Sequence, residues 1–198
     1  MKKLLFVGAS GMVAGRVLPR LCEEYEIVGI SRKNKNLAQY CSTHLLGNLL
    51  TSHGELFAEA FSLHSYDVVV WNPVAFFPSR LIEARRETLH TEFDIAVALP
   101  LLCIQQYLAQ AAPESKRFVG VSSQSAFGDR APRASYSIVK RAQMDMLRTL
   151  SDECPEILFS ILAPASVSNI SDEALSGGFR DALSTEGSGA VIRINEDL

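Results

Sequence analysis

The sequence predicts an α/β fold: a doubly wound parallel β-sheet, covered by helices on both faces, in a single domain. Apolar runs of strand length alternate with segments that carry apolar residues at helical spacing. The strands are apolar along their whole length, which is typical of parallel strands buried on both faces. The 198 residues fit one domain, and no repeat, low-complexity stretch or linker indicates a second.

The first part of the chain predicts four strands and two helices. The strands are Lys3–Val7, Glu26–Ser31, Leu45–Asn48 and Asp67–Asn72, of which the third has the weakest pattern. The helices are Met12–Cys22 and Gly54–Ser62.

The rest of the chain begins with a long helical region at Ser79–Gln110. A kink or break is expected in it at Pro100, because proline cannot supply the backbone N–H of a helix interior. The remaining predicted strands are Arg117–Ser122, Ile157–Ala163 and Ala190–Asn195, and the remaining helices are Tyr136–Asp152 and a short one within Asp172–Leu183.

Composition excludes several classes of function. The net charge is −3, from 19 basic and 22 acidic residues, and no basic cluster suits a nucleic acid. The apolar run Ile95–Ile104 is shorter than the ~20 residues of a membrane span, and glycines soon interrupt the apolar start Met1–Val7, unlike a signal peptide. We therefore expect a cytoplasmic protein that binds neither nucleic acid nor membrane. The four cysteines and four histidines lack metal-ligand spacing, so no metal site is predicted.

A glycine-rich turn directly follows the first predicted strand and opens the first predicted helix. It reads Gly8-Ala9-Ser10-Gly11-Met12-Val13-Ala14-Gly15. Glycine lets backbone N–H groups approach a pyrophosphate closely, and the helix N-terminus adds a positive dipole end. This placement predicts dinucleotide contacts at Gly8, Ser10, Gly11, Met12 and Val13. The alternative is a tight strand-to-helix turn without a ligand.

The end of the second predicted strand favours NADP(H) over NAD(H). Ser31 lies about 20 residues after Gly11, where NAD-binding proteins carry an acidic residue for the ribose 2′-hydroxyl. No carboxylate is present there. The Ser31 hydroxyl can hydrogen-bond a 2′-phosphate, and Arg32 can pair with it through its planar fork. The alternative is that Arg32 and Lys33 form a solvated loop.

Tyr136 and Lys140 are four residues apart on a predicted helix and therefore share one helix face. That face can lie beside Ser123, which follows the preceding predicted strand. A phenol with a pKa of about 10 is a poor acid–base catalyst at neutral pH, and a neighbouring ammonium lowers that pKa. Tyr136 is therefore predicted to exchange a proton with a carbonyl or alcohol oxygen that Ser123 holds by a hydrogen bond.

With these motifs in this order, the chain resembles the short-chain dehydrogenase/reductase superfamily. The resemblance covers residues 1 to 169 and combines the turn Gly8–Gly15, the pair Tyr136-x-x-x-Lys140, and Ser123 thirteen residues before the tyrosine. It implies one Rossmann-like domain over 1–198, with a nucleotide-binding and catalytic core at 1–169 and a short lid segment and last strand at 170–198. It also implies hydride transfer between a nicotinamide cofactor and a small carbonyl or alcohol substrate.

The resemblance implies roles for single residues. Tyr136 would be the acid/base, Lys140 would lower the pKa of Tyr136 and hydrogen-bond the nicotinamide ribose, and Ser123 would orient the substrate oxygen. The further cofactor contacts that it implies are Asn48 near the adenine, Asn72 and Pro73 after the fourth strand, and Pro164 and Val167 near the nicotinamide carboxamide. For Asn72 and Val167 the alternative is plain turn or strand residues.

Three features depart from the family's common pattern. The spacing Gly8-x-x-Gly11-x-x-Ala14 is more similar to extended and atypical members than to short ones. Ala96 stands where many members carry a relay asparagine, with Asp94 the nearest polar alternative. The segment after Asn169 is shorter than in most family members, so we expect any substrate lid to come from Ser171–Ser188. Phe76-Phe77-Pro78 is expected to line an apolar substrate wall or, alternatively, to pack under the long helix.

The expected function is the NADP(H)-dependent interconversion of a carbonyl and an alcohol, with reduction as the direction in cells. Three other classes stay open. An epimerase, isomerase or dehydratase of the same fold would act without net cofactor oxidation, and a sensor would bind NADP(H) without turnover. An interaction module would have no nucleotide site. The regions Ser79–Gln110 and Tyr136–Asp152 correspond to the family's dimer interface, so a homodimer or homotetramer is expected.

Overall fold

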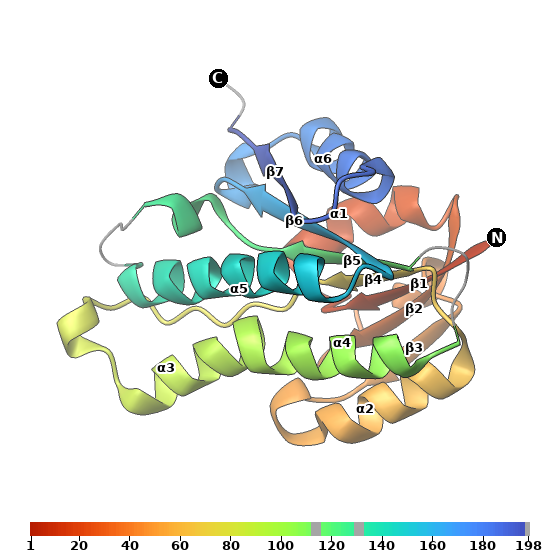
Figure 1. Ribbon diagram of the computed structural model, residues 1–198, viewed down its shortest axis with the longest axis horizontal. Helices are drawn as coiled ribbons and strands as arrows, with labels where there is room; N and C mark the ends of the chain where they lie inside the picture. The colour runs from red at the N-terminus through yellow and green to blue at the C-terminus, as the bar shows by residue number, and fades with distance from the viewer. Residues whose placement is uncertain (112–115, 129–132, 197–198) are drawn as a thin grey trace.

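Seven parallel strands form one sheet in the computed structural model, which describes residues 1–111, 116–128 and 133–196 (Figure 1). The strand order is β3-β2-β1-β4-β5-β6-β7, and every neighbouring pair is parallel. The strands are β1 Lys2–Val7, β2 Tyr25–Ser31, β3 Thr43–Leu46, β4 Val68–Trp71, β5 Lys116–Val121, β6 Ile157–Pro164 and β7 Ala190–Ile194. The predicted strands and the doubly wound fold are confirmed. Only the third strand is displaced, because Asn48 caps the next helix.

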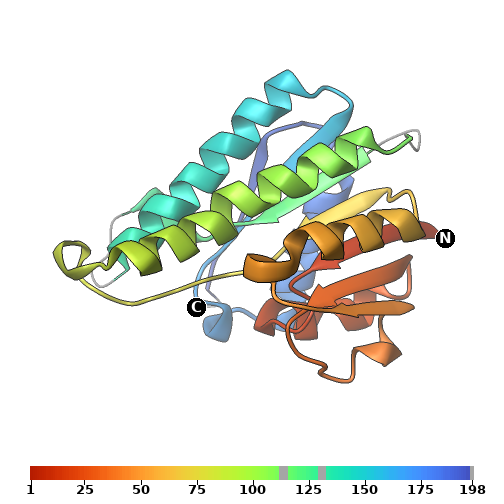
Figure 2. The same cartoon turned by 90° about the horizontal axis from the view of Figure 1, so that it is seen from below.

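Helices cover both faces of the sheet, as Figures 1 and 2 show. The helices are α1 Met12–Leu21, α2 Leu49–Leu63, α3 Arg86–Phe93, α4 Leu99–Ala109, α5 Ala134–Glu153 and α6 Asp172–Ser184. One core lies between the sheet and α2, α4 and α5, and a second lies between the sheet and α1 and α6. The strands are buried on both faces, which is why their sequences are continuously apolar.

The long helical region predicted at Ser79–Gln110 is shorter in the structure and contains a π-helical turn. It starts at Arg86 instead of Ser79, and the chain before it holds only a short 3-10 helix at Leu81–Glu83 with extended backbone on either side. The break expected at Pro100 is a π-helical turn at Asp94–Ala98, directly before α4. Pro100 has no N–H for the carbonyl of Ala96, so the helix widens before the proline. The indole nitrogen of Trp71 donates to the carbonyl of Ile95 at 3.0 Å within this turn.

The reversal of strand order lies between β1 and β4. The chain winds outward from β1 to β3 and then returns to place β4 on the other side of β1. The carboxyl ends of β1 and β4 therefore diverge into the crevice where doubly wound folds bind their ligands. The side chain of Asn72, after β4, donates to the carbonyl of Gly8, after β1, at 3.1 Å.

The segment expected to supply a lid forms a covering helix of the sheet instead. Leu175, Phe179 and Ala182 of α6 are buried in the same core as α1. The rings of Phe6 and Phe179 stack with centroids 6.4 Å apart. Because α6 buries this apolar face against the sheet, it belongs to the sheet's outer layer and lies on the side of α1 (Figure 1).

The continuous helical stretch Arg86–Ala109 is long and apolar enough to cross a membrane by length and composition alone. Core helices of soluble proteins pass the same test. Here nearly half of its apolar window is buried inside the protein, and it packs against α2 and α5. The stretch therefore has the surroundings of a core helix.

Candidate active site

The glycine turn is shaped by contacts that exclude larger side chains. Gly8 has a φ of +85°, which side-chain-bearing residues rarely adopt, and a Cβ there would lie 2.9 Å from the nitrogen of Pro73. A Cβ on Gly11 would lie 3.1 Å from the side-chain nitrogen of Asn72. Gly11 is the N-cap of α1, and none of the described side chains caps that helix. The turn therefore presents backbone N–H groups and a positive helix end to the crevice.

A cavity of about 740 Å³ opens at this turn. Its lining comes from the glycine turn, the ends of β2, β3 and β4, and the segment from β4 toward α3. The volume lies within the roughly 300–1,000 Å³ of small-molecule and cofactor sites. Eight of the predicted cofactor residues line it: Gly8, Ser10, Gly11, Ser31, Arg32, Asn48, Asn72 and Pro73. The glycine cradle, the helix end and the volume fit a dinucleotide.

The other predicted cofactor residues lie outside this lining. Met12 is exposed at the start of α1, while Val13 is buried in the core. Pro164 ends β6, and Val167 begins a short 3-10 helix after it. Phe76 and Phe77, which were expected to line an apolar substrate wall or to pack under the long helix, line the cavity.

Three cations line the cavity beyond β2. Arg32, Lys33 and Lys35 all belong to the lining, and none of the described lining residues is acidic. The Ser31 hydroxyl donates to the carbonyl of Lys33 at 2.8 Å and lies 2.8 Å from the ring nitrogen Nε2 of His44. Its hydrogen is therefore engaged within the protein, and Arg32, Lys33 and Lys35 are the charged donors at this end of the cavity. Asn48 uses its side-chain oxygen to cap α2, accepting from the N–H of Leu50 at 3.2 Å.

The structure brings Ser123, Tyr136 and Lys140 together at the carboxyl end of β5. Ser123 follows the strand, and its hydroxyl oxygen accepts a hydrogen bond from the N–H of Ser125 at 3.1 Å. Tyr136 lies in the first turn of α5, with the ring of Phe76 packed edge-on at a centroid distance of 5.2 Å. The Lys140 nitrogen lies 5.9 Å from the centre of the Tyr136 ring.

Lys140 is buried, and its ammonium group is hydrogen-bonded inside the protein. Its ammonium donates to the carbonyl of Val121 at 2.9 Å and to the side-chain oxygen of Gln143 at 3.0 Å. The Ser122 hydroxyl donates to the carbonyl of Lys140, so the strand end and the helix are joined in both directions. Burial lowers the pKa of Lys140 to about 7, because the charged form loses its hydration.

The pKa of Tyr136 is raised, in contrast to the sequence-based expectation. Burial is the main cause; a hydrogen bond with Ser123 and the Arg133 guanidinium lower the pKa, and the Glu92 carboxylate raises it. Lys140 was expected to lower this pKa. With a pKa of its own near 7, Lys140 is only partly protonated at neutral pH and does not offset the burial of the phenol.

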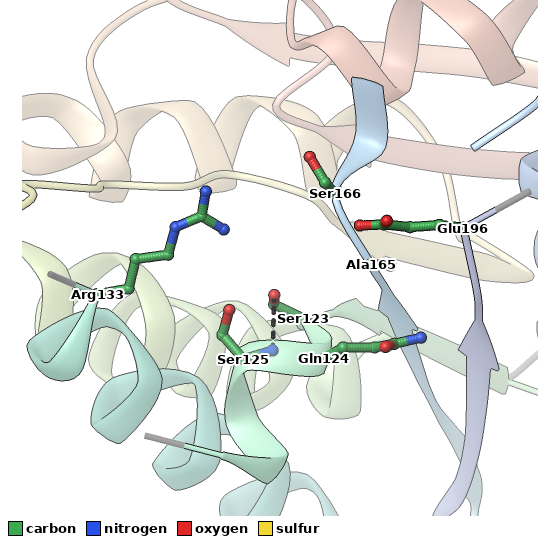
Figure 3. Close-up of a pocket in the computed structure, with 7 residues that line it drawn as sticks. All are labelled: Ser123, Gln124, Ser125, Arg133, Ala165, Ser166 and Glu196. Atoms are coloured by element: carbon green, nitrogen blue, oxygen red, sulfur yellow. Dashed lines mark hydrogen bonds between the residues drawn. The ribbon is translucent and has the colours of Figure 1, made fainter. Parts of the chain in front are cut away.

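A second cavity, of about 240 Å³, lies beside Ser123 (Figure 3). Its walls come from the segment after β5, the start of α5, and the ends of β6 and β7. The lining residues are Ser123, Gln124, Ser125, Arg133, Ala165, Ser166 and Glu196. Figure 3 shows the hydroxyls of Ser125 and Ser166 and the charged ends of Arg133 and Glu196 arranged around one space.

Comparison with known proteins gives a match in structure alone. No family model and no curated protein sequence matches the chain. The solved structure of 4-hydroxyisoleucine dehydrogenase complexed with NADH and succinate has a TM-score of 0.84 at 15% identity, over 98% of this chain and 97% of that chain. The RhlG/NADP complex of Pseudomonas aeruginosa has a TM-score of 0.85 at 18% identity, over 98% and 94%.

A third structure, described as a short chain dehydrogenase/reductase family protein, has a TM-score of 0.85 at 13% identity, over 98% of this chain and 95% of that chain. The chain has the short-chain dehydrogenase/reductase fold. The seven parallel strands and the covering helices described above are that fold, as the sequence predicted.

Ala96 stands where the resemblance to the short-chain dehydrogenase/reductase superfamily led us to expect a relay asparagine. Ala96 is buried in the π-helical turn and offers no polar group. Asp94, the expected substitute, is exposed. Glu92, one helical turn before Ala96, is buried instead, and its oxygen Oε2 has no hydrogen-bond partner in the described part of the chain. Its spacing of four residues from Ala96 was the sequence signal for it.

Arg16 on α1 holds the segment that follows β6, and the sequence did not single it out. Its guanidinium donates to the carbonyl of Val167 at 2.5 Å, to the carbonyl of Ile170 and to the carboxylate of Asp172. These bonds hold the segment after β6 against the helix that follows the glycine turn. The partners are about 150 residues away in the chain, so no local pattern reveals them.

Proposed function

We propose that this chain is a member of the short-chain dehydrogenase/reductase superfamily and an NADP(H)-dependent oxidoreductase for a carbonyl/alcohol pair. The observation that carries the proposal is the meeting of Ser123, Tyr136 and Lys140 at the carboxyl end of β5, next to the cavity of the glycine turn. Two structurally similar proteins are described as complexes with NADH and with NADP. They support a nicotinamide cofactor of either kind.

The bound nicotinamide would supply or accept a hydride at the reacting carbon. In the reduction, that hydride forms a C–H bond, the carbonyl π electrons move to oxygen, and Tyr136 gives the oxygen its proton. The raised pKa keeps Tyr136 protonated at neutral pH, which suits a proton donor. Ser123 holds the same oxygen by a hydrogen bond. Lys140, whose nitrogen lies 5.9 Å from the centre of the Tyr136 ring, would hydrogen-bond the nicotinamide ribose.

The proposed cofactor contacts divide into four groups, by the part of the dinucleotide that each would meet. Backbone groups at Gly8, Ser10, Gly11, Met12 and Val13 would hold the pyrophosphate. Asn48 would lie at the adenine, and Asn72 and Pro73 along the middle of the cofactor. Pro164 and Val167 would meet the nicotinamide amide with their backbone.

A preference for NADP(H) over NAD(H) is proposed from charge. Arg32, Lys33 and Lys35 line the cavity where no acidic side chain of the described lining would repel a 2′-phosphate. Calorimetry with NADPH and NADH should give a lower dissociation constant for NADPH. Arg32→Ala should weaken NADPH binding about tenfold and leave NADH nearly unchanged. Equal or tighter binding of NADH to the unmodified chain would refute the preference.

Replacing Tyr136 by Phe tests the proposed mechanism. The variant keeps the ring that packs on Phe76 and loses the hydroxyl group whose proton the reaction needs. Turnover of carbonyl substrates, followed by NADPH absorbance, should fall by at least a hundredfold. The dissociation constant for NADPH should stay within about twofold. An active Tyr136→Phe enzyme would contradict the mechanism.

A non-catalytic NADP(H) sensor is the second candidate. Two observations favour it: the Lys140 ammonium is already bonded to Val121 and Gln143, and Ala96 offers no relay group. A sensor would bind NADPH tightly and show no turnover on a broad carbonyl panel. An epimerase or dehydratase would instead convert substrate with no net change in NADPH.

We also propose a homodimer formed through α4 and α5 and a cytoplasmic location. Phe93, Leu102 and Ile138 are large apolar residues exposed on α3, α4 and α5. Helices α3 and α4 form one continuous stretch that runs beside α5 (Figure 2). Exposed apolar residues on neighbouring helices suit a contact between copies. Sedimentation should give twice the monomer mass for the unmodified chain and the monomer mass for Ile138→Lys.

A further inference from the structure

The smaller cavity beside Ser123 carries opposite charges on facing walls. Arg133 begins α5 and Glu196 follows β7, and both line the cavity with hydroxyls of Ser123, Ser125 and Ser166. No ion pair joins Arg133 to Glu196 among the residues that the structure describes. Each charge therefore keeps free hydrogen-bonding capacity toward the cavity (Figure 3).

Both charges are held by neighbouring contacts. The Arg133 guanidinium lies over the ring of Phe76, 5.7 Å from its centre, and the same ring packs on Tyr136. A guanidinium that uses its face on a ring keeps its N–H edges for a carboxylate. On the other wall, the side chain of Gln124 donates to the carbonyl of Ile194 at 2.8 Å.

A second contact fixes the same wall. Gln124 also donates to the side-chain oxygen of Asn195 at 2.9 Å, and the Arg193 guanidinium lies 3.6 Å from the centre of the Phe127 ring. The end of β7 is thus attached to the segment that carries Ser123. This attachment sets Glu196 at the cavity.

We propose that the cavity selects a small zwitterion, an alcohol or ketone that carries one carboxylate and one ammonium group. Arg133 would bind the carboxylate, Glu196 the ammonium, and Ser123 the reacting oxygen. The inference rests on the proposed function, since Ser123 and Tyr136 act as described there. The charged groups take part in no bond change. In the oxidation, the alcohol carbon gives a hydride to the oxidised nicotinamide, and its hydroxyl gives a proton to the phenolate form of Tyr136, which becomes the phenol that acts as proton donor in the reduction.

The volume and the lining exclude other substrate classes. About 240 Å³ holds a molecule of few heavy atoms, and Ala165 is the one apolar residue of the described lining. A carboxylate without an ammonium would face Glu196 unpaired, and an ammonium without a carboxylate would face Arg133. A neutral alcohol would desolvate both charges without replacing their hydrogen bonds. A zwitterion matches both walls.

Four alcohols with one reacting group separate the contributions of the two charges. Threonine carries both, 3-hydroxybutyrate lacks the ammonium, 1-amino-2-propanol lacks the carboxylate, and 2-propanol lacks both. The kcat/KM with NADP⁺ near neutral pH should be highest for threonine and fall about tenfold or more with each lost charge. Equal values for the four alcohols, or the highest value for 2-propanol, would overturn the proposal.

Two variants assign each charge to its wall. Arg133→Gln should remove the higher kcat/KM of threonine relative to 1-amino-2-propanol, which lacks the carboxylate. Glu196→Gln should remove the higher kcat/KM of threonine relative to 3-hydroxybutyrate, which lacks the ammonium. Arg133 also affects the pKa of Tyr136. The measured quantity is therefore the ratio of kcat/KM for two substrates, in which an effect on Tyr136 cancels. Arg148→Gln on the same helix and Glu186→Gln, both exposed, are the matched controls and should leave the ratios unchanged. Unchanged ratios in Arg133→Gln and Glu196→Gln would overturn the proposal.

Binding measured without turnover separates this inference from the proposed function. Calorimetry of the Tyr136→Phe variant, with and without NADP⁺, should bind threonine more tightly than the other three alcohols. If the unmodified chain turns over none of them but Tyr136→Phe shows this binding order, the proposed reaction fails and the zwitterion site stands. If Tyr136-dependent turnover occurs with no charge preference in binding or rate, the reaction stands and the zwitterion site fails.

Discussion

The carboxylate of Glu92 accepts a hydrogen bond from the backbone N–H of Phe77 at 3.0 Å. The bond ties the segment after β4 to helix α3 and leaves the ring of Phe76, the preceding residue, packed on Tyr136. The second oxygen of Glu92 is buried with no hydrogen-bond partner among the described residues. An acidic side chain in this position both orders the segment and acts on the pKa of the tyrosine.

Glu92→Gln should lower the pKa of Tyr136. The amide oxygen can still accept from Phe77, while the negative charge that raises this pKa is removed. The alkaline limb of the pH profile for reduction should move to lower pH, by roughly one pH unit or less. Glu87→Gln, an exposed residue of the same helix, should leave the profile unchanged. An unmoved limb in Glu92→Gln would show that its charge does not act on Tyr136.

Lys140→Met should remove a pH dependence of stability. The folded-state pKa of Lys140 is about 7, against an ordinary value of 10.5, so the unfolded chain binds more protons between these values. The free energy of unfolding of the unmodified chain should then rise from pH 7 upward by about 1 kcal/mol per pH unit relative to Lys140→Met. Urea unfolding at several pH values up to about 8.5 measures the difference. Lys2→Met, at an exposed lysine, should keep the original slope.

Gly8→Ala should destabilise the protein by about 1–3 kcal/mol, because alanine is strained at a φ of +85° and its Cβ would meet the backbone of Pro73. Dinucleotide binding should weaken with it. Gly15→Ala is the matched control, since a Cβ there meets no atom within 4 Å. It lies exposed within α1 and should stabilise the chain by up to about 1 kcal/mol. Equal effects of the two substitutions would contradict the assigned role of the turn.

Arg16→Gln should loosen the segment after β6. The variant loses the planar fork that binds the carbonyls of Val167 and Ile170. Hydrogen exchange of amides 167–172 should become faster, and NADPH binding should weaken, while the sheet amides keep their protection. Arg20→Gln, exposed on the same helix, should change neither. Unaltered exchange at 167–172 would mean that other contacts hold the segment.

The strands were predictable because burial on both faces leaves an unbroken apolar run in each. The start of the long helix was not, because Ser79–Arg85 has no local signal that separates an extended segment from a helix. The expected break at Pro100 was correct in kind, and the structure places it a few residues earlier as a π-helical turn. There the Ile95 carbonyl accepts a hydrogen bond from the indole of Trp71, which lies on strand β4, far away in the sequence.

By itself, the sequence determined the fold class, the glycine turn and the order of Ser123, Tyr136 and Lys140. Each of these depends on residues close together in the chain, where periodicity and spacing act directly. Only the tertiary structure decided the electrostatics of the site. Burial raises the pKa of Tyr136 although Lys140 is nearby, and Glu92 takes the buried position that Asp94 does not. Arg133 and Glu196, from different elements, line one cavity. Desolvation and charge pairing depend on neighbours in space, and the sheet brings those neighbours together from distant parts of the chain.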